Sequence, residues 1–110
     1  METQVEIIAG ICGFQTKAQI TGNDDQTVHL AIESDCKNIQ NLARQLKTHE
    51  PIDSFSEIDP SSQSVILTTA RECLKGGCAG CVVPSGLFKG MQVAAGLALP
   101  KDISLKITQE

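Results

Sequence analysis

Three cysteines lie within the nine-residue stretch CLKGGCAGC, at Cys73, Cys78 and Cys81, with three glycines between them. Thiolates bind zinc and iron–sulfur clusters, and they are also the reactive groups of dithiol redox proteins. Glycines allow a loop to curl tightly, so that several sulfur atoms can converge on one centre. This stretch, which we call the cysteine loop (residues 73–81), therefore carries most of the chemistry that the sequence offers.

The spacing C-x4-C-x2-C is that of three of the four cluster ligands in plant-type ferredoxins. In that family the fourth ligand lies downstream, whereas no cysteine follows Cys81 here, so the ferredoxin fold is rejected while cluster binding stays open. A fourth ligand would have to be Cys12 or Cys36. Zinc is the other metal to consider, because the CxxC pair Cys78 and Cys81 could be joined by Cys73 and one of the outlying cysteines.

Other interpretations of the cysteines stay open. Cys78 and Cys81 precede a predicted helix, whose N-terminus favours a thiolate, as in dithiol redox proteins. Cysteine is also among the most buried residue types, so packing alone would explain the five side chains. An enzyme with Cys78 or Cys81 as nucleophile is less favoured, because no positioned base, acid pair or Ser/His/Asp order stands out.

Composition restricts the function further. A chain of 110 residues that is 41% hydrophobic and 20% charged fits one globular domain, over residues 1–110. A net charge of −4, without Trp, Tyr or a basic stripe, disfavours nucleic acid as a partner. We find neither a signal peptide nor a membrane span, and therefore expect a cytoplasmic protein. Thiols stay reduced there, so five cysteines do not indicate a disulfide framework.

Hydrophobic residues alternate with polar ones in four segments, a pattern typical of strands with one buried face. The four predicted strands are residues 5–11, 14–20, 28–33 and 103–108. A turn at Cys12-Gly13 and a hairpin connection at TGNDDQ join the first three strands into a meander.

Helical spacing of apolar residues predicts three helices. The helices are predicted to start after Ser34 or Asp35, at Ser61 or Ser62, and at Pro84, and the last two to stop at Gly76-Gly77 and at Pro100. The first start places Cys36 in the first helical turn. Residues 49–60 contain two prolines and no sustained period, so we predict a loop in which Glu57 and Asp59 are solvated.

These elements predict an α+β two-layer sandwich of order βββαααβ, in which three helices cover one face of a four-stranded, mostly antiparallel sheet. The residues predicted to share one core are Ile7, Ile20, Leu30, Leu42, Ile66, Met91 and Leu105. Small residues in the third helix, such as Gly90 and Ala94, would allow close approach to the sheet or to another helix. A homodimer through that helix and a separate protein partner are both left open.

The predicted meander brings the thiols toward one end of the sheet. Its first and third strands run in the same direction, so Cys12 and Cys36 lie at the same edge. If the cysteine loop packs over that edge, all five sulfurs meet in one pocket. We therefore predict a zinc or iron–sulfur site made by Cys73, Cys78 and Cys81 and completed by Cys12 or Cys36.

Four stretches, AGICGF, ESDC, GGCAGCVVPSG and AAGLALPKD, resemble a family of small uncharacterised cysteine-containing proteins from anaerobic archaea and bacteria, a domain of unknown function. The resemblance spans nearly the full chain and implies an anaerobe's cytoplasm, where iron–sulfur centres are chemically at ease. The family has no established activity to carry over. The competing hypotheses are a metal or iron–sulfur protein, a non-catalytic interaction module, and a dithiol protein using Cys78 and Cys81.

Overall fold

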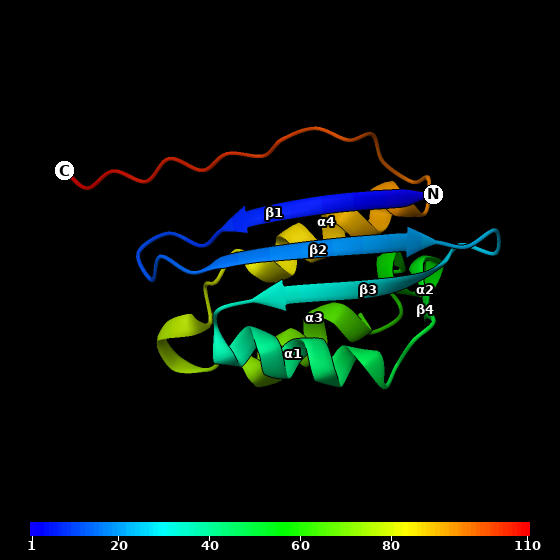
Figure 1. The fold of residues 1–110 in the computed structure, drawn as a ribbon, viewed down its shortest axis with the longest axis horizontal. Helices are drawn as coiled ribbons and strands as arrows, with labels where there is room; N and C mark the ends of the chain where they lie inside the picture. The colour runs from blue at the N-terminus through cyan, green and yellow to red at the C-terminus, as the bar shows by residue number, and fades with distance from the viewer.

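The computed structural model describes residues 1–110 and shows one sheet with helices packed on one side of it (Figure 1). The strands are β1 (Glu2–Ile8), β2 (Gln15–Gly22), β3 (Thr27–Ser34) and β4 (Ile52–Asp53). The helices are α1 (Lys37–Lys47), α2 (Ser54–Ile58), α3 (Val65–Cys73) and α4 (Val83–Ala94), with a 3-10 turn η1 at Gly76–Cys78. The α+β class and the four-stranded antiparallel sheet are confirmed.

The sheet is a meander in the order β1-β2-β3-β4, and every neighbouring pair is antiparallel. Along β2, Thr16, Ala18 and Ile20 are buried, whereas Lys17 and Gln19 are exposed. One face of the sheet is therefore apolar and covered by helices, and the other face is polar and open. β1 and β3 run in the same direction and finish at the same end of the sheet, as Figure 1 shows.

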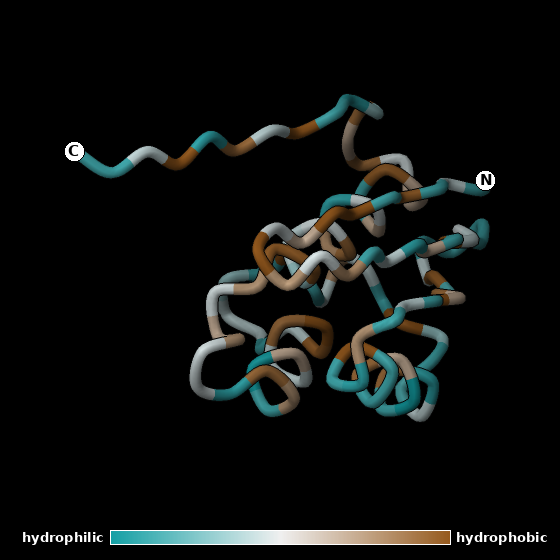
Figure 2. Tube along the Cα trace, turned by 60° about the vertical axis from the view of Figure 1, so that its left-hand side comes forward, coloured by the Kyte–Doolittle hydropathy of each residue, from teal (hydrophilic) through white to brown (hydrophobic).

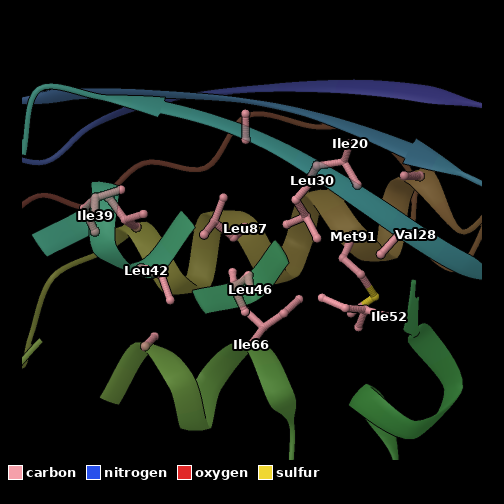
Figure 3. Close-up of a cluster of buried hydrophobic side chains, with 14 of the residues drawn as sticks. Ile20, Val28, Leu30, Ile39, Leu42, Leu46, Ile52, Ile66, Leu87 and Met91 are labelled. Carbon is pink, nitrogen blue, oxygen red and sulfur yellow. The ribbon is translucent and has the colours of Figure 1, made fainter. Parts of the chain in front are cut away.

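The core is a single cluster of 17 buried residues. Six of the seven predicted core residues belong to it: Ile7, Ile20, Leu30, Leu42, Ile66 and Met91. Helices α1 and α4 pack directly on the sheet, whereas α3 packs chiefly on α1 and α4. Figure 3 shows this stacking, with the Ile66 side chain of α3 directed toward Leu46 of α1. Helices α1 and α4 thus form a layer against the sheet, and α3 packs on the other side of that layer.

Close approach between α4 and the sheet depends on glycines. A Cβ atom added at Gly90 would lie 2.5 Å from Cγ2 of Val5 and 2.7 Å from Cδ1 of Ile20. A Cβ atom at Gly22 would collide with the backbone carbonyl of Ala94 at the end of α4. The small residues of this helix therefore serve contact with the sheet of their own chain.

Two predicted segments differ from the structure. Residues 103–108 form no strand, and Leu105, which was predicted to be in the core, is exposed. The backbone is extended there (Figure 1), but no neighbouring strand pairs with it, so the predicted fourth strand of the sheet is wrong. Residues 49–60 are not a plain loop, because they hold β4 and α2. The fourth strand therefore lies between helices, and the order βββαααβ is only partly right.

Smaller differences concern element boundaries. β1 ends at Ile8, so Ile11 lies in the turn and is exposed. α3 begins at Val65 after an N-cap at Ser64, whose side chain accepts a hydrogen bond from the backbone N–H of Leu67. Several serines precede this helix, and composition alone does not identify which one caps it.

Candidate functional site

Three segments with cysteines lie at the end of the molecule where β1 and β3 finish. They are the turn between β1 and β2 (residues 9–14), the junction between β3 and α1 (residues 34–38), and the cysteine loop, all at the left of Figure 1. We call this region the thiol end. The meander topology places the first two segments there, as the sequence predicted.

Helix α1 contacts the cysteine loop at two points. The Nδ2 atom of Asn41 lies 3.6 Å from Sγ of Cys73, and Nδ2 of Asn38 lies 3.9 Å from Sγ of Cys78. Asn38 and Asn41 are three residues apart and therefore project from the same side of the helix. Both ends of the stretch from Cys73 to Cys78 are thus held against one helical face. Nothing in the sequence distinguished these asparagines from other polar residues of α1.

Cys36 is the N-cap residue of α1 rather than a residue of its first turn. Its backbone N–H donates to Oγ of Ser34 at 3.1 Å, and its own side chain makes no capping hydrogen bond. The first turn of α1 contains no acidic residue. Cys36 therefore lies at the end of α1 where the backbone N–H groups of the first turn have no carbonyl partner within the helix.

The cysteines of the loop differ in exposure. Cys73 and Cys81 are half-buried and pack against the core, whereas Cys78 is exposed. Burial, followed by the charge of Glu72, raises the pKa of the Cys73 thiol, and Lys75 opposes this shift. Cys73 is therefore held in the protonated form more firmly than an ordinary cysteine.

Cys12 lies in the turn between β1 and β2, and it is exposed. The turn depends on Gly10 and Gly13, which have φ values of 96° and 73°. The N–H of Gly13 donates to the carbonyl of Gly10 at 2.9 Å, which closes the turn and carries Cys12 at its tip.

No group of three or more His, Cys, Asp or Glu side chains in the structure is close enough to hold a metal ion. All five cysteines are free thiols. The fold therefore brings the predicted segments to one end without closing them into a ligand set. The assignment of Cys12, Cys36, Cys73, Cys78 and Cys81 as metal ligands stays a prediction.

A shallow hollow of about 600 Å³ between α2, α3 and α4 is the other candidate site. Glu57 borders it and is buried, not solvated as predicted. Its carboxylate accepts hydrogen bonds from the Ser64 hydroxyl at 2.8 Å and from the backbone N–H groups of Val65 and Ile66 at 2.6 Å and 2.9 Å. Glu57 thus caps the N-terminus of α3, and these hydrogen bonds give its carboxylate a structural role.

Comparison with known proteins identifies a family for this chain. Residues 3–107 match the family of unknown function DUF6951, and the chain belongs to this family. No curated protein and no solved structure matches the chain. None of the helices is long and apolar enough to cross a membrane.

Proposed function

We propose that this member of the DUF6951 family binds a soft metal ion or an iron–sulfur centre through the cysteine loop and Cys36. The site forms when the loop closes onto the start of α1. The observation that carries the proposal is the pair of contacts from Asn38 to Cys78 and from Asn41 to Cys73. They hold the loop against the helix whose N-cap is Cys36.

The chemistry of the donors supports this choice. Cys36, Cys73, Cys78 and Cys81 provide four sulfur ligands, the number that a structural zinc ion or an iron–sulfur cluster requires. Metal binding would displace the proton from Cys73, so affinity should rise with pH. The side-chain amides of α1 would donate hydrogen bonds to bound sulfur atoms and so tune the centre.

Loop closure is compatible with the packing. Residues 75–80 are all exposed, and a Cβ atom added at Gly76, Gly77 or Gly80 would meet nothing within 4 Å. Residues 75–80 can therefore move closer to Cys36 at the start of α1 without displacing core side chains. Cys12 is the alternative fourth ligand, but it lies on a separate turn and contacts neither α1 nor the cysteine loop through a hydrogen bond.

The test is metal analysis after anaerobic purification, followed by cobalt(II) titration of the metal-free protein. Sulfur-to-cobalt absorption reports thiolate ligands, and a chain without Trp or Tyr gives a low background in the near ultraviolet. Cys78→Ser and Cys36→Ser should each weaken binding at least about 10-fold, whereas the control Cys12→Ser should leave it unchanged. Absence of any metal and of cobalt binding would contradict the proposal, as would an equal loss with Cys12→Ser.

A dithiol function is the second candidate, because Cys78 and Cys81 share one turn in which the N–H of Cys81 donates to the carbonyl of Cys78 at 3.1 Å. Oxidised glutathione would take two electrons and two protons from these thiols as they form a disulfide. Thiol counting by alkylation and mass spectrometry separates the candidates. Specific loss of the Cys78 and Cys81 thiols, without metal binding, would favour the dithiol function.

A further inference from the structure

Residues 101–110, which we call the tail, form an extended segment whose apolar side chains have no partner. Ile103, Leu105 and Ile107 expose 62%, 73% and 91% of their surface and alternate with Ser104 and Lys106. Figure 2 shows this alternation along a tail that stands clear of the helices and the sheet. The pattern is that of a strand with one face meant for burial. The DUF6951 match extends to residue 107 and therefore includes Ile103, Leu105 and Ile107.

An open sheet edge is available on the same molecule. β1 is the first strand in the sheet order and pairs only with β2. The N–H of Gly22 donates to the carbonyl of Met1, and that of Ala9 donates to the carbonyl of Phe14. Odd-numbered residues of β1 therefore bond to β2, and the backbone groups of the even-numbered residues point to the free edge. The even-numbered residues of β1 are Glu2, Gln4, Glu6 and Ile8.

The opposite edge of the sheet is covered. β4 pairs with the start of β3, and the next outward N–H of β3, that of Leu30, donates to Oε1 of Glu50 at 2.7 Å. His29 and Lys47 hold the other oxygen of this carboxylate at 3.3 Å and 3.4 Å. Proteins commonly protect an edge strand in such ways. The β1 edge has no comparable cover, although β1 is seven residues long and free of proline.

Charge fixes a register for an added strand. On the open face, Glu33 lies opposite Lys17 and Lys17 lies opposite Glu6, so the row alternates in sign and ends at the free edge with Glu6. Lys106 opposite Glu6 would continue that alternation. In an antiparallel pairing this register places Leu105 opposite Ile7, with the apolar side chains of the tail on the helix-covered face. The hydrophobic alternation is compatible with this register, and the charge pair selects it from the registers that the alternation allows.

We propose that the tail is a strand for a second copy of this chain, so that each copy lays its tail along β1 of the other in a two-fold dimer. In this structure the tail runs in the same direction as its own β1 without pairing to it (Figure 1). A two-fold axis perpendicular to the sheet makes β1 of the second copy run opposite to β1 of the first. The tail of the first copy is then antiparallel to β1 of the second, as all neighbouring strands in the sheet are. The two equivalent tail–β1 pairings then provide hydrogen-bond partners for both free β1 edges and bury the apolar side chains of both tails. This dimer does not depend on the thiol end.

The first experiment measures the mass of the full chain in solution by size exclusion with light scattering. Refractive-index detection is used because Trp and Tyr are absent. The expected mass at high concentration is twice the 11.7 kDa of one chain, falling on dilution. Leu105→Asp should weaken dimerisation at least about 10-fold, because it puts a charge on the buried face of the added strand. The matched control Ser104→Asp adds the same charge to the open face of the added strand and should change dimerisation little.

The second experiment tests the edge and the register. Gln4→Pro removes an N–H that points to the free edge but spares the bonds to β2, so it should abolish the dimer while far-ultraviolet circular dichroism still shows a folded chain. Lys106→Glu should weaken the dimer several-fold, and adding Glu6→Lys should restore part of the lost affinity, because a lysine at position 6 also faces Lys17. Hydrogen exchange should show slow amides at Gln4 and Glu6 in the dimer only.

Three outcomes would overturn the proposal. One is a monomer at all concentrations with unprotected β1 amides. Another is a monomer in which Gln4 and Glu6 are protected, which would show that the tail folds back onto its own β1. The third is a dimer that Leu105→Asp and Gln4→Pro leave intact.

Discussion

Cys73 ends α3 with its thiol half-buried against the core and next in sequence to the carboxylate of Glu72. Because its pKa is raised, the folded chain holds this proton more tightly than the unfolded chain does. The stability that follows is fully present below the pKa of an unfolded cysteine. It is lost as the pH rises through the raised value of the folded state. At neutral pH Cys73 therefore remains a thiol until a metal ion or a base removes the proton.

This environment predicts a slow reaction of Cys73 with iodoacetamide at pH 8, compared with exposed Cys78. Glu72→Gln should raise the rate at Cys73 several-fold, because removal of this negative charge lowers the pKa of the thiol. Lys75→Gln should lower the rate. Peptide-resolved mass spectrometry measures both, with Cys12 as the internal reference. A rate at Cys73 that neither substitution changes would mean that access alone controls its reactivity.

At the scale of elements, the meeting of β2 and α4 depends on Gly22. A side chain there would strike the backbone of Ala94, and backbone atoms of two packed elements cannot yield as a flexible side chain does. Gly22→Ala should therefore lower the free energy of unfolding by about 3 kcal/mol. The control is Gly77→Ala, which meets nothing within 4 Å and should change it by less than about 0.5 kcal/mol. Urea unfolding followed by circular dichroism measures both, and equal effects would contradict the close packing.

Elements with a sustained period could be predicted from the sequence, and shorter ones could not. The three strands of the meander and helix α1 follow from alternation and helical spacing over seven or more residues. β4 has two residues and α2 has five, which are too few to show the period of a strand or of a helix in the sequence. The burial of Glu57 could not be predicted either. Its hydrogen-bond partners, Ser64, Val65 and Ile66, reach it only when the loop between them folds, and no sequence period indicates that fold.

At the scale of the whole molecule, the strand topology was easier to predict than the distances between the cysteine sulfur atoms. A meander forces β1 and β3 to end together, and this suffices to bring Cys12 and Cys36 to the thiol end. The separations between sulfur atoms depend on the path of the cysteine loop, which no periodicity specifies. The tail shows the same limit, because alternation indicates a strand without naming the strand that pairs with it.

The tail contributes no buried side chain to the fold of the single chain. The core cluster contains no residue beyond Ala95, and Ile103, Leu105 and Ile107 are all exposed. Deleting residues 101–110 should therefore change the free energy of unfolding in dilute solution by less than about 0.5 kcal/mol. Leu30→Ala, which empties a buried position of β3, should cost about 3 kcal/mol in the same assay. Urea unfolding at several protein concentrations makes the comparison.

The dependence of unfolding on protein concentration distinguishes a tail that belongs to the monomer fold from a tail that joins two copies. In the dimer, binding of the second copy stabilises the folded state by mass action, so the unfolding midpoint of the full chain should rise with concentration. The shortened chain has no strand to exchange, and its midpoint should stay constant. If the shortened chain were instead destabilised equally at every concentration, the tail would belong to the monomer fold, and β1 would be closed by its own chain.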